Sequence, residues 1–226
     1  MTNRTVLLIT LLLAVPFCTF ASPLTIVNSS FDAQVLSLNG VLLGSITGWT
    51  APLTLGNQGI WAPTALSLNV GGSPGLITNP ATGINGSNVA ISRGGTISQT
   101  LVSTLTSTAG MVYTLSVDIG HRFELPESDY TIALFAGATQ LASIFDPVMP
   151  AAGALSFATL QYTTTGLEAV IGQNLSIELI TNASAGNQTI YDNVTLDVGT
   201  PEPASALLML TGIGLVYLTK RKRVSR

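Results

Sequence analysis

Hydrophobic and polar residues alternate in short segments through the middle of the chain. The alternation is clearest at 113–119, 175–179 and 194–198, where every second residue is apolar and many are β-branched or aromatic. A period of two residues with such side chains is typical of half-buried antiparallel strands. No window before residue 200 has a long helical period. The pattern therefore predicts an all-β fold, an antiparallel jelly-roll β-sandwich.

A tight turn is predicted near the start of this region. Asn39-Gly40 separates two apolar segments, Val35–Leu38 and Val41–Leu43. Asn-Gly between two such segments is a strong hairpin signal. We expect the two segments to pair with each other as antiparallel strands.

Met1–Ala21 has the pattern of a secretory signal peptide. Arg4 supplies the positive charge, residues 6–15 are mostly apolar, and small residues precede Ser22. The alternative is a first transmembrane helix. Cys18 is the only cysteine and lies inside this segment. Removal of the signal peptide therefore leaves a mature protein without disulfides.

The C-terminal end contains an apolar run that is followed by a basic cluster. As a helix, Ala204–Thr219 would cover about 24 Å, compared with a hydrocarbon core of about 30 Å. Lys220 and Arg221 can extend to the membrane interface, and a basic tail stays in the cytoplasm. The pattern predicts one C-terminal transmembrane helix with the preceding domain outside. The alternative is a buried C-terminal helix of a soluble domain.

The order of this tail resembles a known sorting signal. A Pro-Glu-Pro motif, a short apolar helix and a basic cluster at the chain end are similar to the PEP-CTERM signal of Gram-negative bacteria. The matching residues are Pro201, Glu202, Pro203, Lys220, Arg221, Lys222 and Arg223. The resemblance implies processing by an exosortase-type membrane transpeptidase. It also divides the chain into a signal peptide (1–21), a sandwich (22–199) and a sorting signal (200–226).

A second resemblance covers the sandwich itself. The segments that carry it, in order, are Asn28–Asp32, Gly48–Thr50, Asn88–Ala90, Ser98–Leu101 and Asp192–Leu196. Their series is similar to the galactose-binding-like sandwiches of bacterial carbohydrate-binding modules. In those modules, acids at the positions of Asp32 and Asp192 often share a structural calcium ion, which suits carboxylate oxygens.

The alternation of the last strand also concerns Asp192. Asp192 shares its parity with Val194 and Leu196, which predicts that its carboxylate points inward. An inward carboxylate needs a partner. The calcium ion is one candidate, and hydrogen bonds from backbone amides are the other.

The charge of the predicted exported domain excludes a nucleic-acid binder. Between residues 22 and 200, two arginines face ten acidic residues, a net charge of −8. Binding to phosphate backbones needs the opposite sign. A surface rich in Ser, Thr, Asn, Gln and Gly suits a hydroxyl-rich environment such as exopolysaccharide.

No catalytic motif in the sequence has all the residues that its chemistry requires. Residues 71–75 formally match the G-x-S-x-G nucleophile elbow, but Pro74 lacks the N–H that the oxyanion hole requires. His121 is the only histidine. The sequence therefore predicts that the protein is not an enzyme.

Candidate ligand contacts lie in a polar segment and at one tryptophan. His121, Arg122 and Phe123 belong to the polar segment 118–129 between two predicted strands, and functional residues favour such loops. Trp61 is a candidate for stacking on a ligand, whereas Trp49 is expected in the core. The alternative for the polar segment is a solvated connection.

Together these patterns predict an exported, transiently membrane-anchored protein of the envelope or the exopolysaccharide matrix. Its role would be structural or adhesive. A carbohydrate-binding module with a defined sugar site is the alternative, followed by a hydrolase. No cofactor is predicted apart from the calcium ion.

Overall fold

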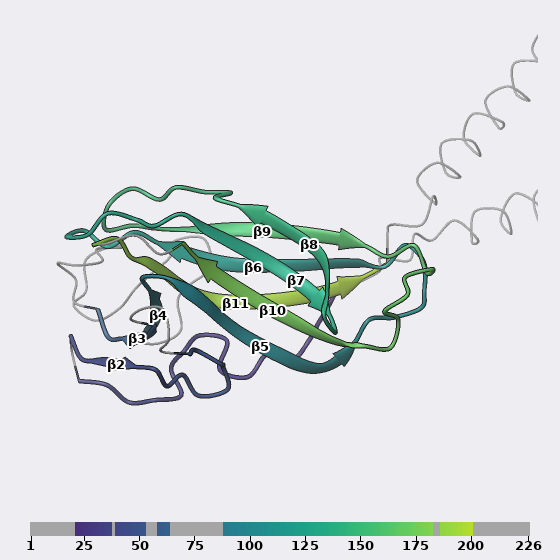
Figure 1. The fold of residues 1–226 in the computed structure, drawn as a ribbon, viewed down its shortest axis with the longest axis horizontal. Helices are drawn as coiled ribbons and strands as arrows, with labels where there is room; N and C mark the ends of the chain where they lie inside the picture. The colour runs from purple at the N-terminus through teal and green to yellow at the C-terminus, as the bar shows by residue number, and fades with distance from the viewer. Residues whose placement is uncertain (1–20, 38, 53–57, 64–87, 183–185, 201–226) are drawn as a thin grey trace, which may run out of the picture. The chain divides into compact units, whose positions relative to one another are not determined.

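The computed structural model describes residues 21–37, 39–52, 58–63, 88–182 and 186–200. These residues form eleven β-strands and no helix (Figure 1), so the predicted all-β sandwich is confirmed. Ser22–Val198 forms one compact unit. Within the described ranges, no helix is long and apolar enough to cross a membrane. The predicted signal peptide up to residue 20 and the predicted C-terminal helix lie outside them.

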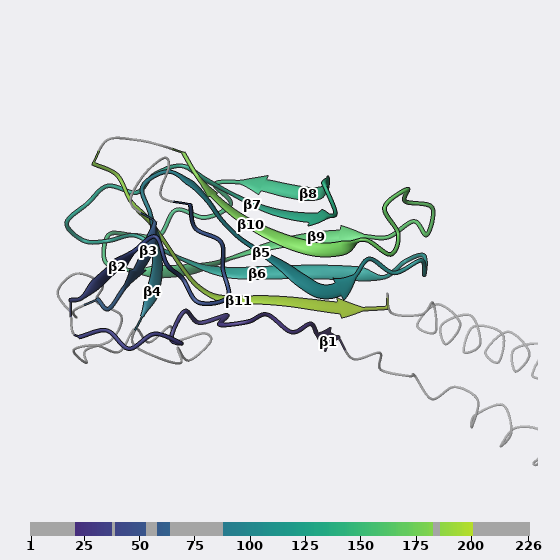
Figure 2. The ribbon, with the colours of Figure 1, turned by 60° about the horizontal axis from the view of Figure 1, so that its bottom comes forward.

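The strands form two sheets that face each other (Figures 1 and 2). The large sheet contains β1 (Ser22–Pro23), β2 (Val41–Leu43), β3 (Gly59–Trp61), β4 (Val89–Ser92), β6 (Val112–Gly120), β9 (Leu155–Thr163) and β11 (Thr189–Gly199). The small sheet contains β5 (Gly95–Thr104), β7 (Tyr130–Ala136), β8 (Thr139–Phe145) and β10 (Asn174–Thr181). The order in the large sheet is β2-β3-β4-β11-β6-β9, with β1 beside β11, and the order in the small sheet is β5-β10-β7-β8. The last strand thus lies inside the large sheet.

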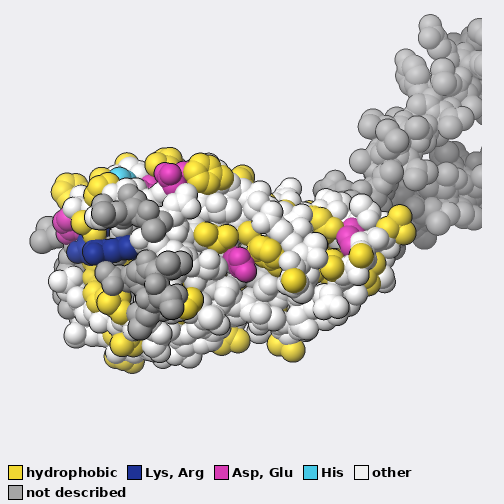
Figure 3. Space-filling view, in the orientation of Figure 1, with side chains coloured by type: hydrophobic (Ala, Val, Ile, Leu, Met, Phe, Trp, Pro, Cys, Tyr) yellow, Lys and Arg dark blue, Asp and Glu magenta, His cyan; other side chains and the backbone are white. Residues whose placement is uncertain are grey.

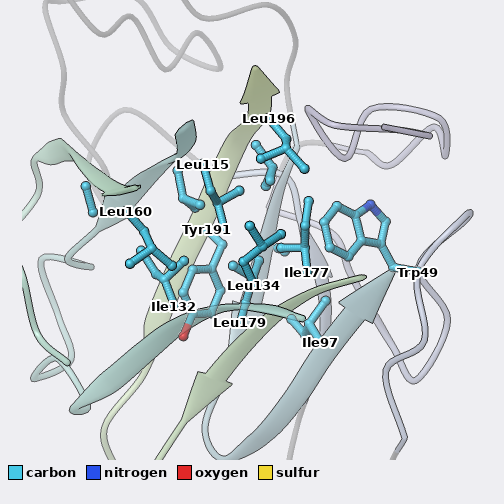
Figure 4. Packing of buried hydrophobic residues seen from close by; sticks show 14 of the residues in the cluster. Trp49, Ile97, Leu115, Ile132, Leu134, Leu160, Ile177, Leu179, Tyr191 and Leu196 are labelled. Carbon is cyan, nitrogen blue, oxygen red and sulfur yellow. The ribbon is translucent and has the colours of Figure 1, made fainter. Parts of the chain in front are cut away.

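The main core lies between the two sheets, as Figure 4 shows. Leu115 from β6, Leu134 from β7 and Ile177 from β10 are buried there and belong to strands with alternating sequences. Trp49 also belongs to this core, as predicted, with its ring 5.3 Å from that of Phe31. Full burial of one such apolar side chain stabilises the fold by about 1.5–3 kcal/mol. The alternation therefore decides which face of each strand points inward.

The alternation of β11 breaks at Asp192 and Asn193. Tyr191 and Val194 both belong to the main core, with two residues between them instead of one. Asn193 has a positive φ of 49°, a left-handed conformation that Asn tolerates better than most residues. This arrangement is that of a β-bulge, which redirects the neighbouring side chains. Asp192 is buried as expected. Its side chain, however, lies on the outer face of the large sheet, whereas its neighbour Tyr191 points into the main core.

The predicted hairpin around Asn39-Gly40 is wrong in its strand pairing. The turn itself is present, because the Gly40 N–H donates to the Ser37 carbonyl. However, β2 pairs with β3 rather than with the segment before the turn, and Val35 is 99% exposed. Leu36 from that segment packs against the main core instead, and β2 takes its hydrogen-bonding partner from β3.

Candidate functional site

A second apolar cluster lies on the outer face of the large sheet, away from the main core. Trp61, Val89, Ile91 and Ile190 form this cluster, and Leu155 packs against it. The four cluster residues alternate along their strands with main-core residues such as Ile60 and Tyr191. The register places Trp61 opposite Val89 and Ile91 opposite Ile190. We call these four residues and Leu155 the apolar strip; the four are at most 3% exposed.

Asp192 adjoins the apolar strip. Its neighbour Tyr191 is paired with Ala90, so the next position on β11 comes beside Val89, about 10 Å or two strand spacings from Trp61. Asp192 is completely buried. Its Oδ1 accepts the Asn193 N–H at 2.8 Å, while its Oδ2 has no hydrogen-bond partner. A buried carboxyl oxygen without a partner calls for a functional explanation.

Two further carboxyl groups lie near Asp192. Asp118 accepts a hydrogen bond from the Asn193 side-chain amide at 3.2 Å, and Asp32 accepts the Asn88 N–H at 2.9 Å. Burial is the main cause that raises the pKa of Asp192 well above its ordinary value. The Asn193 N–H opposes this, and the charges of Asp32 and Asp118 add to it. The direction of this shift favours the protonated, neutral form of Asp192.

Arg122 covers the aromatic end of the apolar strip. Its guanidinium carbon lies 4.4 Å from the centre of the Trp61 ring, a cation–π distance. Its Nε donates to Glu124 Oε2 at 2.9 Å. The ring is held from its edge, because Trp61 Nε1 donates to Asn39 Oδ1 at 3.1 Å.

Gly120, at the end of β6, allows Leu155 and Ile190 of the apolar strip to pack close to the β6 backbone. A Cβ at this position would lie 2.7 Å from a Leu155 methyl carbon and 2.9 Å from the Ile190 Cβ. Any larger residue would push these two side chains apart. The same contacts show that the end of β6 lies against the start of β11.

The structure brings together only some of the predicted site residues. Trp61 and Arg122 are in contact, but Trp61 is fully buried. His121 contacts the Pro150 carbonyl through Nδ1 at 3.0 Å, and Phe123 is 65% exposed. The predicted sorting residues Pro201, Glu202, Pro203 and Lys220–Arg223 lie outside the described part of the chain.

Sequence inspection missed the strip and Asp118. The signal was weak, since the apolar stretches Val89–Ile91 and Ile190–Tyr191 are shorter than the runs of about four to eight residues that indicate a strand buried on both faces. Asp118 sits between the core residues Val117 and Ile119, so its outward direction follows from alternation. Its burial does not, because that depends on neighbouring strands.

A groove of about 320 Å³ lies elsewhere, between residues 23–29 and β11. None of its lining residues can be ionised, so it offers no acid or base. Among the described residues, no group of three or more His, Cys, Asp or Glu is arranged to hold a metal ion. The strip and Asp192 are therefore the better candidate for chemistry.

Comparisons with known proteins point to one family. The family model described as HpiC1 cyclase (HpiC1-like) matches residues 22–197. The apo form of a cyclase from Fischerella sp. is 22% identical, with a TM-score of 0.65 over 81% of this chain and 98% of that chain. No curated protein matches the chain.

Two similar structures contain ligands. A Stig cyclase, Fisc, from Fischerella sp. TAU in complex with (3Z)-3-(1-methyl-2-pyrrolidinylidene)-3H-indole is 21% identical, with a TM-score of 0.65 over 80% of this chain and all of that chain. A cyclase from the same organism in complex with 4-(1H-indol-3-yl)butan-2-one is 22% identical, with a TM-score of 0.63 over 81% of this chain and all of that chain. At this identity the likeness shows the fold.

The match to a cyclase family overturns the function predicted from the sequence. The assignment as a PEP-CTERM matrix protein with a galactose-binding-like domain is wrong, and so is the prediction that the protein is not an enzyme. The predicted partners are therefore wrong as well. They were an exosortase-type transpeptidase, a membrane reached through the C-terminal helix and exopolysaccharide. The sequence prediction followed the short pattern at the C-terminus. The likeness to the cyclase family is instead spread over residues 22–197.

The family match covers almost the whole compact unit Ser22–Val198, including both the apolar strip and Asp192. The similar structures agree with it in fold. The chain therefore belongs to the HpiC1 cyclase-like family.

Proposed function

We propose that the protein is a cyclase that closes a ring on an apolar aromatic substrate, with Asp192 as the proton donor. One observation carries this proposal. A fully buried carboxyl group with a raised pKa and an unpartnered oxygen lies beside a strip of aromatic and aliphatic side chains. A general acid needs to hold its proton at the working pH and to reach the substrate.

The proposed reaction is an acid-catalysed isomerisation. The Asp192 O–H bond breaks, and its proton adds to an electron-rich carbon or a basic nitrogen of the substrate. An electron pair elsewhere in the same molecule then attacks the resulting cation and closes the ring. The ring-closed cation returns a proton to the Asp192 carboxylate, so substrate and product have the same composition.

The surroundings of Asp192 suit such a cation. The Asn193 N–H stabilises the carboxylate that forms when the proton leaves. The face of the Trp61 ring attracts positive charge, as its contact with Arg122 shows. The buried strip keeps water away from the reactive intermediate.

The aromatic character of the substrate is supported by two considerations. Trp61 offers the largest fully buried side chain on the outer face of the sheet. Two structurally similar cyclases hold molecules with an indole or indole-derived ring. Indoles are therefore the first compounds to test.

A deuterium experiment tests the function. The purified protein is incubated in D₂O with indoles that carry an alkenyl or carbonyl side chain. We expect a ring-closed isomer that contains deuterium from the solvent, detected by mass spectrometry and NMR. Ring closure without carbon-bound deuterium would rule out proton transfer from Asp192 to a substrate carbon. A panel in which nothing binds or reacts would contradict the cyclase proposal.

A structural calcium ion at Asp32 and Asp192 is the other role for these carboxylates. Calcium takes six to eight oxygen ligands. Both side chains already accept a backbone N–H, and no described group of three acids or histidines is arranged around a metal. Asp192 Oδ2 has no hydrogen-bond partner and is open to a cation, so melting with and without EDTA separates the two roles.

Export remains our proposal for localisation, on the pattern of Met1–Ala21. Cleavage would release a domain that starts at Ser22, the first residue of the family match. We expect N-terminal sequencing of the mature protein to begin at Ser22. Detection of Met1 on the exported protein would contradict cleavage at this position.

A further inference from the structure

The two arginines of the domain lie at the same end of the large sheet, where β11 begins. Arg93 follows β4 and Arg122 follows β6. β4 is antiparallel to β11. β6 is antiparallel to β11 as well, because Gly120 lies against Ile190 while Asp118 lies against Asn193. Both arginines therefore lie where β11 begins, and in Figure 3 dark blue side chains are seen at one end of the visible face.

The domain is acidic, yet both of its cations lie at this one end of the large sheet. Between residues 22 and 200, ten acids are present and the only cations are Arg93 and Arg122. A ligand with negative charge is attracted to such a place.

Arg93 and Gln188 leave buried polar atoms without partners. Arg93 directly follows β4 and Gln188 directly precedes β11, at the end of the sheet where Ser92 pairs with Thr189. Arg93 Nε is buried and has no hydrogen-bond partner, and neither does Gln188 Oε1. Gln188 is only 1% exposed. Buried polar groups in native proteins are nearly always paired with protein, water or ligand.

Arg122 also has donors to spare. Its ion pair with Glu124 uses Nε, and a guanidinium has four further N–H groups in a planar fork. Such a fork binds a carboxylate through two parallel hydrogen bonds. Its position over Trp61 means that it can reach a group attached to a ring that stacks there.

We propose that the substrate carries a carboxylate, which Arg122 and Arg93 bind. The inference rests on the proposed function, since it names the substrate class of the same site. The aromatic ring takes the place of the guanidinium on Trp61, and the guanidinium pairs with the carboxylate. A single negative charge is favoured over a phosphate dianion, because Glu124 is paired with Arg122 and would repel the second charge.

Two nearly isosteric probes test the charge preference. Indole-3-acetate and indole-3-acetamide differ in a carboxylate against a neutral amide. We expect the parent protein to bind the acetate at least about tenfold more tightly, as measured by isothermal titration calorimetry. Arg122→Gln should remove this preference and leave the affinity for the acetamide nearly unchanged, and Arg93→Gln should reduce the preference. Arg122→Lys should keep part of it, because the charge remains without the fork.

The controls separate this inference from the proposed function. Glu178→Gln, on β10 of the small sheet, should bind both probes like the parent, and circular dichroism checks that each variant folds. Equal binding of the two probes, or a preference that survives both Arg122→Gln and Arg93→Gln, would overturn the carboxylate inference alone. Failure of both probes to bind the parent would overturn the aromatic site as well. Equal loss of both probes in a folded Arg122→Gln protein would assign Arg122 a structural role instead.

Discussion

Asp192→Asn is expected to lower the rate of ring closure by about 10²- to 10⁴-fold, the usual contribution of a general acid. The amide has nearly the same shape as the carboxyl group, and its oxygen can still accept the Asn193 N–H. It cannot donate an acidic proton. The free energy of unfolding should change by less than about 1 kcal/mol at neutral pH, because one neutral group replaces another. Rates from the deuterium assay and thermal melts measure the two quantities.

Asp118→Asn is the matched control for this variant. It keeps the shape of a neighbouring carboxyl group on the same face and removes its negative charge, which contributes to the raised pKa of Asp192. Its activity should fall far less than that of Asp192→Asn. Equal losses in the two variants would mean that the acidic group acts as a unit rather than through one proton donor.

EDTA separates the proton donor from the calcium site. If Asp32 and Asp192 bound calcium in the native state, EDTA would lower the melting temperature of the parent but not that of Asp192→Asn. The proton donor predicts no effect of EDTA on either protein. A drop in the parent alone, after calcium has been raised to about millimolar, would reassign Asp192 to the metal.

The strands of the main core could be predicted from sequence because one face of each is buried. The alternation at 113–119 and 175–179 matches β6 and β10, and their apolar residues enter the core between the sheets. Burial of one face fixes the period of two residues. The pairing partners were harder to foresee, because β3, β4 and β11 lie far apart in the chain and yet are neighbours.

The candidate site could not be predicted for a related reason. Asp192 was expected to share a face with Val194, but the bulge at Asn193 turns it to the other side of the sheet. Asn is one of several residues that tolerate the left-handed conformation, so the presence of Asn193 in the sequence does not predict a bulge. The apolar strip likewise forms only when the strands that carry Trp61, Val89 and Ile190 are brought together.

A second carboxyl group with a raised pKa, that of Glu127, affects the stability of the domain. Glu127 lies between β6 and β7, where its backbone carbonyl accepts the Asn187 side-chain amide at 3.0 Å. Both of its carboxyl oxygens are buried without a hydrogen-bond partner. Desolvation, with a smaller effect from the charge of Asp146, raises the pKa of Glu127 to about 8. Tyr130 and Tyr191 are the other ionisable groups close enough to interact with it.

This raised pKa makes the folded domain less stable as the pH rises. In the unfolded chain the carboxyl group has its ordinary pKa of 4.5, whereas the folded value is about 8. Between these values the folded state binds more protons, so the free energy of unfolding falls with increasing pH. Such a shift corresponds to about 5 kcal/mol for a fully buried group, and solvent screening of the half-buried side chain lowers this to about 2 kcal/mol.

Glu127→Gln should therefore be more stable than the parent above about pH 8 and similar to it below about pH 5. At about 2–4 °C per kcal/mol, the expected gain in melting temperature at alkaline pH is about 4–8 °C. Asp192 changes stability in the same direction but is present in both proteins, so the difference between their melting curves isolates Glu127. Glu178→Gln is the matched control, because this partly exposed residue lies on the small sheet, and its melting profile should follow the parent at every pH. A Glu127→Gln protein that melts with the parent at about pH 9 would show that the carboxylate reaches water when it ionises.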